Sequence, residues 1–153
     1  MFTRMFLLLV LGTGGASAYA DDMFDALSLK NKETGSKMFT AHNYHLGIIK
    51  HIVLFKYKDN VTPAQKKEVI QRFLKLRESK RPGEQHPYVM SITTGSQSSG
   101  EKASMGFEQA FIVTFSSEGD RNYYVGTPLV EDPVYYDQNH AEFKKICWPT
   151  TGK

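Results

Sequence analysis

Apolar and polar residues alternate along two segments of the chain, a pattern typical of strands in a half-buried sheet. The segments are residues 48–57 and 107–116, and a shorter strand is predicted over residues 88–94. Both faces of the first strand carry apolar residues in its middle, so we expect it to be covered on both sides. One of these faces contains four residues of interest: His51, Val53, Phe55 and Tyr57.

Between the first two strands the spacing of apolar residues becomes that of a helix. Thr62, Pro63 and Gln65 have the features of a helix start, because threonine caps, proline suits the first position and glutamine can complete a capping box. The apolar residues that follow predict a helix from about Pro63 to Lys80, with Phe73 on the face toward the sheet.

Two shorter helices are expected after the last strand. One covers residues 120–125, and the other begins at a cap formed by Asp137 and runs through Ile146, with His140 on its inner face. The order strand, helix, strand, strand, helix predicts an α+β fold whose sheet has helices on one face. The residues after Cys147 leave little length for a closing strand.

The composition fits one compact domain. The chain has 153 residues, of which 41% are hydrophobic and 23% are charged, and this leaves little room for a second domain. The formal net charge is +3, which is too small to indicate a nucleic-acid partner. Cys147 is the only cysteine, so no intramolecular disulfide can form and we expect a buried thiol.

The first 20 residues have the pattern of a secretory signal peptide, with one cation, a short apolar run and then small residues that offer cleavage after Ala18 or Ala20. A membrane span would need about 20 continuous apolar residues, and glycines interrupt this run, so we expect no membrane span. The sequence therefore predicts a secreted or periplasmic protein. Its parts are a signal peptide at 1–20, an irregular arm or linker at 21–46 and one domain at 47–153.

The histidines are the main candidates for chemistry. His42 and His45 have the spacing of a metal-binding pair on a helix, but they lie in an expected loop without a cysteine or acidic residue nearby, so we expect no metal site. The glycine motifs that bind phosphates and dinucleotides are missing from the sequence, so we expect no cofactor. His51 and His140 can each act as a general acid or base, since imidazole titrates near neutral pH, or can be a hydrogen-bonded histidine of the core.

Three stretches of sequence are recognisable by their order and spacing. The first is residues 50–59 with the helix start at Thr62, and the second is Gly95 and Ser96 followed by residues 106–115. The third comprises residues 121–124, Pro128 and residues 140–143. Together they resemble the family of stress-responsive dimeric α/β-barrel proteins.

This resemblance implies a ferredoxin-like antiparallel sheet with helices on one face. It also implies a homodimer in which two sheets enclose an α/β barrel, and that barrel would be the cavity for a small apolar or aromatic molecule. If His51 faces the barrel, the alternation of the first strand places three neighbours there as well. The residues expected to contact the ligand are Val53, Phe55, Tyr57, Phe73, Gln109 and Phe111.

One plant branch of the family contains a polyketide cyclase, in which a histidine and a tyrosine move protons during an aldol cyclisation. The resemblance puts His140 at that histidine, Tyr124 at that tyrosine and His51 at a further cavity histidine. These three are the expected catalytic residues. Gln109 and Phe73 stand where that branch has a histidine and a tyrosine, so we do not expect the cyclase reaction itself.

Two functions remain as alternatives. One is the binding of a small apolar or aromatic molecule, with cofactor-independent acid/base turnover of a cyclase or lyase type. The other is a non-enzymatic, stress-associated structural or interaction protein whose barrel is only a dimer core. The acid/base alternative requires Tyr124 and His140 to lie close together. Here the sequence departs again from the cyclase branch, because residues 129–138 are inserted between Pro128 and His140.

Overall fold

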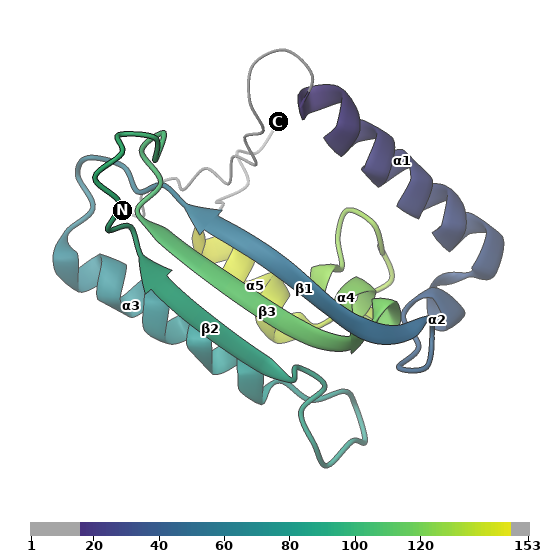
Figure 1. Cartoon of the computed structure of the whole chain (residues 1–153). Coiled ribbons are helices and arrows are strands. Elements are labelled where there is room, and N and C mark those ends of the chain that lie inside the picture. The colour runs from purple at the N-terminus through teal and green to yellow at the C-terminus, as the bar shows by residue number, and fades with distance from the viewer. Residues whose placement is uncertain (1–15, 148–153) are drawn as a thin grey trace.

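The computed structural model describes the backbone of residues 16–147 and the side chains of residues 22–147. The body of the predicted signal peptide and the end of the chain, where a closing strand would form, lie outside the described residues. None of the described helices is long and apolar enough to cross a membrane. In chain order the elements are α1 (Ala16–Thr34), α2 (Ser36–Phe39), β1 (Leu46–Phe55), α3 (Pro63–Lys75), η1 (Leu76–Glu78), β2 (Ser91–Ser96), β3 (Gln109–Ser117), α4 (Glu118–Val125), η2 (Pro133–Tyr135) and α5 (Gln138–Cys147) (Figure 1).

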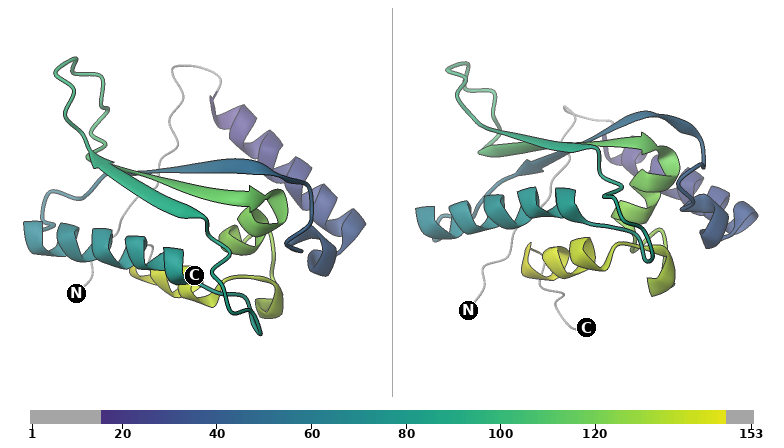
Figure 2. Two further views of the ribbon diagram at one scale, coloured as in Figure 1. Left: turned by 60° about the horizontal axis from the view of Figure 1, so that its bottom comes forward. Right: turned by 90° about the horizontal axis from the view of Figure 1, so that it is seen from below.

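The three strands form one antiparallel sheet in the order β1-β3-β2. The central strand is β3, where Val113 lies opposite His51 of β1 and Ile92 of β2. Two helices, α3 and α5, lie side by side along one face of the sheet (Figure 2). The predicted α+β fold, a ferredoxin-like antiparallel sheet with helices on one face, is confirmed.

Helix α3 begins at Pro63 with Thr62 as its cap, as the sequence predicted. The Thr62 side chain accepts a hydrogen bond from the Gln65 backbone, and the Gln65 side chain accepts one from the Thr62 backbone, which completes a capping box. The face of α3 that was predicted to meet the sheet does so, since Phe73 is buried and its ring stacks on Phe111 with centroids 4.0 Å apart. Phe55 closes this aromatic cluster, with edge contacts to both rings.

The other face of the sheet has no cover within the described chain. Ile52 of β1 and Ile112 of β3 lie opposite each other, and both are exposed, as is Ile48 near the start of β1. The expectation that β1 is covered on both sides therefore holds within this chain for one side only. Ile52 and Ile112 form a short hydrophobic strip across adjacent strands there, and Lys50 separates it from Ile48.

The segment predicted to be an irregular arm is helical. It forms α1 and α2, which lie on the β1 side of the sheet (Figure 1). Phe39 and Val130 are fully buried in a second, smaller core, which also contains Leu27 and Tyr44. The arm thus gains its order from the distant insertion around Val130. A scan for local periodicity could not detect this partner, because most helical stability comes from tertiary packing.

The arm also contacts the start of α4 through backbone hydrogen bonds. The amide of Glu118 donates to the carbonyl of His45, and the amide of Gly119 donates to the carbonyl of Tyr44. In addition, the Asn122 side chain donates to the carbonyl of Phe39. The two backbone bonds satisfy amides in the first turn of α4 that have no partner within the helix.

Candidate functional site

A cavity of about 380 Å³ lies between the sheet and α5. This volume is in the range of sites for small molecules. Its position corrects the sequence-based expectation: His51 faces the helices, so the cavity it lines is inside one chain rather than in a barrel between two sheets. Alternation alone could not choose between the faces, because both carry apolar residues. The lining residues are His51, Val53, Phe55, Phe73, Val125, Thr127, His140, Phe143 and Lys144.

His140 is held in one orientation and one tautomer. Its Nδ1 atom lies 2.6 Å from the backbone carbonyl oxygen of Tyr124. A carbonyl oxygen only accepts hydrogen bonds, so Nδ1 carries the proton and Nε2 has a free lone pair. The helix start is positioned by Asp137, whose carboxylate accepts from the amides of Asn139 and His140 and from the Tyr88 hydroxyl.

Tyr124 links the two cavity histidines. Its ring stacks on His140 with centroids 3.8 Å apart and meets the His51 ring edge-on at 5.9 Å. Its hydroxyl is buried without a hydrogen-bond partner among the described residues, and burial raises the pKa of that hydroxyl well above its usual value. The three residues expected to be catalytic are therefore neighbours in space.

Both imidazoles are uncharged at neutral pH. Burial lowers the pKa of His140 to about 3, and the positive charge of Lys144 acts in the same direction. Burial also lowers the pKa of His51 to about 4, with a further contribution from Arg121. A neutral imidazole with a free Nε2 lone pair can accept a proton, and it can do so readily only if negative charge develops beside it.

The insertion at residues 129–138 leaves the pairing of Tyr124 with His140 intact. The amide of Asp137 donates to the carbonyl of Tyr123, so the end of the insertion returns to the end of α4. Between these points the chain loops out, and Val130 packs into the small core with α1 and α2. The extra residues therefore project away from the site without separating its two aromatic groups.

The residues expected to contact a ligand fall into two groups in the structure. Val53, Phe55 and Phe73 line the cavity, and Phe111 lies behind Phe73. Gln109 does not line this cavity, because its amide donates to the Thr94 hydroxyl and the Gly95 carbonyl at the far end of the sheet. The remaining expected residue, Tyr57, lies beyond the end of β1 and contributes to a separate hollow formed by residues 56–60.

Four cavity residues were not found from the sequence: Val125, Thr127, Phe143 and Lys144. The Lys144 ammonium donates to the carbonyls of Val125 and Thr127, each at 2.8 Å. The sequence feature that could have placed Lys144 in the cavity is its spacing, since it follows His140 by four residues and so lies on the same face of α5. A lysine near a helix end is usually assigned to solvent, which is why this signal was overlooked.

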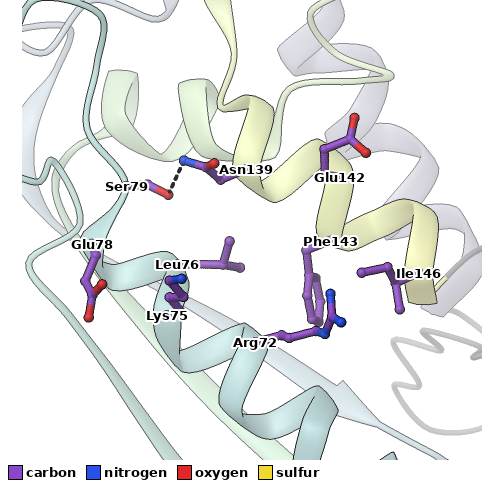
Figure 3. A pocket seen from close by; sticks show the side chains of 9 residues that line it. All are labelled: Arg72, Lys75, Leu76, Glu78, Ser79, Asn139, Glu142, Phe143 and Ile146. Atoms are coloured by element: carbon purple, nitrogen blue, oxygen red, sulfur yellow. Dashed lines mark hydrogen bonds between the residues drawn. The ribbon is translucent and has the colours of Figure 1, made fainter.

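A second hollow, of about 410 Å³, lies in the groove between α3 and α5 (Figure 3). Leu76, Phe143 and Ile146 supply its apolar surface, and Arg72 and Glu142 are at its edges. It contains no histidine, and Arg72 is already paired with Glu68. This groove therefore provides no side chain suited to acid/base chemistry near neutral pH, unlike the cavity on the other side of Phe143.

The pair His42 and His45 does have acidic neighbours, contrary to what the sequence indicated. His42 Nδ1 lies 2.8 Å from a carboxylate oxygen of Asp120, and His45 Nδ1 lies 3.3 Å from one of Glu118. Both acids belong to α4, far away in sequence. Within residues 16–147, no group of three or more potential ligands is arranged to hold a metal ion. The two pairs instead attach the arm to α4.

Comparison with known families gives one match. The profile of the family described as Stress responsive A/B Barrel Domain matches residues 49–151, which is well over half of the chain. The match begins within β1, so α1 and α2 lie outside it. No curated protein is similar enough to the sequence to count as a match.

Several solved structures are similar to this chain. A hydroxynitrile lyase from Passiflora edulis is 23% identical, covers 69% of this chain and 85% of its own, and has a TM-score of 0.51. An ensemble-refined crystal structure of a protein from Arabidopsis thaliana is 24% identical, with coverages of 64% and 80% and a TM-score of 0.48. A dimeric protein of unknown function and ferredoxin-like fold from Bacteroides fragilis is 24% identical, with coverages of 67% and 85% and a TM-score of 0.42. At these identities the similarity to the lyase supports the fold alone.

Proposed function

The chain belongs to the stress responsive A/B barrel domain family, and we propose that it binds a small apolar or aromatic molecule in the cavity between its sheet and α5. The proposal rests mainly on the observation that a neutral imidazole of fixed tautomer, that of His140, lines an aromatic cavity. Phe55, Phe73 and Phe143 supply apolar surface around it. A few polar groups in a mainly apolar cavity are typical of small-molecule sites.

The same site suits acid/base turnover without a cofactor. His140 would accept a proton at Nε2 from the bound molecule, and the resulting imidazolium would return that proton to the product. Its Nδ1–H bond to the Tyr124 carbonyl keeps the ring in place through both steps. His51, also neutral, lies across the Tyr124 ring and can hold a second polar group of the molecule.

Binding is tested with a cavity-filling variant. We expect 2-naphthamide, a neutral aromatic probe, to bind the wild-type protein, and we expect Val53→Phe to abolish binding because the larger side chain occupies the cavity. Isothermal titration calorimetry measures both. The matched control is Ile52→Phe, which adds the same ring to the opposite face of β1 and should leave the dissociation constant unchanged. Equal binding by wild type and Val53→Phe would contradict the proposal, as would no binding by the wild type.

Turnover is tested at His140. Native mass spectrometry of the purified protein, compared with denaturing spectra, gives the mass of a co-purifying ligand and so identifies a substrate to assay. We expect His140→Gln to lower kcat about 100-fold while substrate still binds, because the amide cannot accept the proton. Unchanged kcat in this variant would contradict acid/base catalysis by His140 and leave the binding function in place.

We further propose that a second copy of this chain covers the open face of the sheet. Ile48, Ile52 and Ile112 are exposed there, and a homodimer would bury them. The same strip is the observation that favours the alternative function, a non-enzymatic interaction protein. The native mass spectrum distinguishes a ligand-binding dimer from an interaction protein, because a dimer without bound ligand favours the interaction protein.

Export by the signal peptide stays a prediction from the sequence.

A further inference from the structure

Lys144 is the only fixed charge among the described residues that line the cavity. It lies one helical turn after His140, and burial lowers the pKa of its ammonium group. Two of its N–H groups donate to the carbonyls of Val125 and Thr127. An ammonium group has three donors, and the next partner, the Thr127 hydroxyl, is 3.5 Å away, longer than an ordinary hydrogen bond. One donor is therefore free to bind a ligand.

The charge of Lys144 is not balanced within the cavity. None of the nine described lining residues is acidic. The positive charge of Lys144 lowers the pKa of His140, and no carboxylate acts on that pKa. The nearby acids do not line the cavity, since Glu142 of α5 pairs with Lys145 and Asp137, just before α5, accepts from Tyr88. The electrostatic potential of the cavity is therefore positive, which favours an anion.

The remaining lining fits an aromatic ring. Phe55 and Phe143 each make an edge-on contact with Phe73, so the rings form a wall beside the two histidines. A planar ring can pack against such a wall, with a polar substituent at Lys144 and another at His140. Apolar surface and a single cation together select a molecule with one aromatic body and one anionic group.

From these observations we infer that the ligand is an aromatic carboxylate, with its carboxylate bound by Lys144 and its ring against Phe55, Phe73 and Phe143. This inference rests on the proposed function and narrows it to a class of ligand. Lys144 then acts as the residue that determines specificity, while His140 faces the group that exchanges a proton. The anion also offsets the positive charge that His140 would acquire when it takes a proton.

The test compares two ligands of nearly equal shape, 2-naphthoate and neutral 2-naphthamide. We expect the wild-type protein to bind 2-naphthoate about ten-fold more tightly, since a hydrogen bond to a charged group is stronger than one between neutral groups. In Lys144→Gln we expect this preference to fall to about one. Damage to the turn at Val125 and Thr127 would weaken both ligands equally, whereas loss of the charge weakens only the anion.

The matched control is Lys145→Gln, because Lys145 is the exposed neighbour on α5 and pairs with Glu142. It should keep the wild-type preference. If 2-naphthamide binds and 2-naphthoate binds no more tightly, the inference is overturned while the proposed function stands. If the preference survives in Lys144→Gln, another group binds the anion and the inference is again overturned. If neither ligand binds the wild-type protein, the proposed function itself fails.

Discussion

Replacing Gly119 with alanine is expected to lower the free energy of unfolding by about 4 kcal/mol. A Cβ atom at this position would lie 1.8 Å from the carbonyl oxygen of Ala41 and 3.0 Å from the Cβ atom of Tyr44. A backbone oxygen cannot move aside as a flexible side chain can, so residues 40–45 must leave α4. Their departure breaks the backbone bonds to Glu118 and Gly119 and uncovers the small core.

Urea denaturation measures this loss, and hydrogen exchange of the α1 and α2 amides shows whether the arm is the part released. The matched control is Gly100→Ala, where nothing lies within 4 Å of the added atom, and its effect should stay within about 0.5 kcal/mol. An equal urea midpoint for Gly119→Ala and wild type would show that the arm does not pack closely on α4.

Acidification is expected to destabilise the protein already between pH 6.5 and 5, by about 3 kcal/mol from the two cavity histidines. Their pKa values are lowered in the folded state, to about 3 for His140 and about 4 for His51, whereas an unfolded histidine titrates near 6.5. The unfolded chain therefore binds more protons as the pH falls. The stabilisation is fully present above pH 6.5 and is lost as the pH approaches the folded-state values. Both folded-state values lie at least one pH unit below this interval, so the two histidines contribute nearly equally to the loss.

The measurement is the free energy of unfolding from urea curves at a series of pH values. His140→Gln serves as the comparison, because glutamine does not titrate and the variant should lose less stability on acidification than the wild type. The difference between the two curves isolates the contribution of His140 from that of the carboxylates. Parallel curves for the two proteins would show that His140 titrates normally in the folded state.

Much of the fold could be predicted because its signals are local. The capping box at Thr62, the apolar face around Phe73 and the alternation of β1 each depend on neighbouring residues, and the structure shows all three. The covered face of β1 could not be predicted in the same way. His51 and Ile52 lie on opposite faces of one strand, and both faces are apolar, so the choice depends on where α5 packs.

The candidate site depended more on resemblance than on physical signals. Resemblance to the family identified Tyr124 and His140, and the structure places them in contact. No pattern in the sequence shows that His42 will meet Asp120, since the two are brought together only by the docking of the arm. Lys144 was missed for a related reason: its environment is made by Val125 and Thr127, in a turn whose position follows from the whole fold.

The docked arm sets a practical limit on where the protein can be cut for expression. A fragment that starts at residue 47 would retain every residue of the family match but would lose Phe39 and Leu27, the cover of Val130. Asp120, fully buried in the whole chain, would lose His42 and keep only Arg81 and Ser116 as partners. A fragment that starts near residue 22 retains these contacts, so we expect its yield of soluble protein to be the higher of the two.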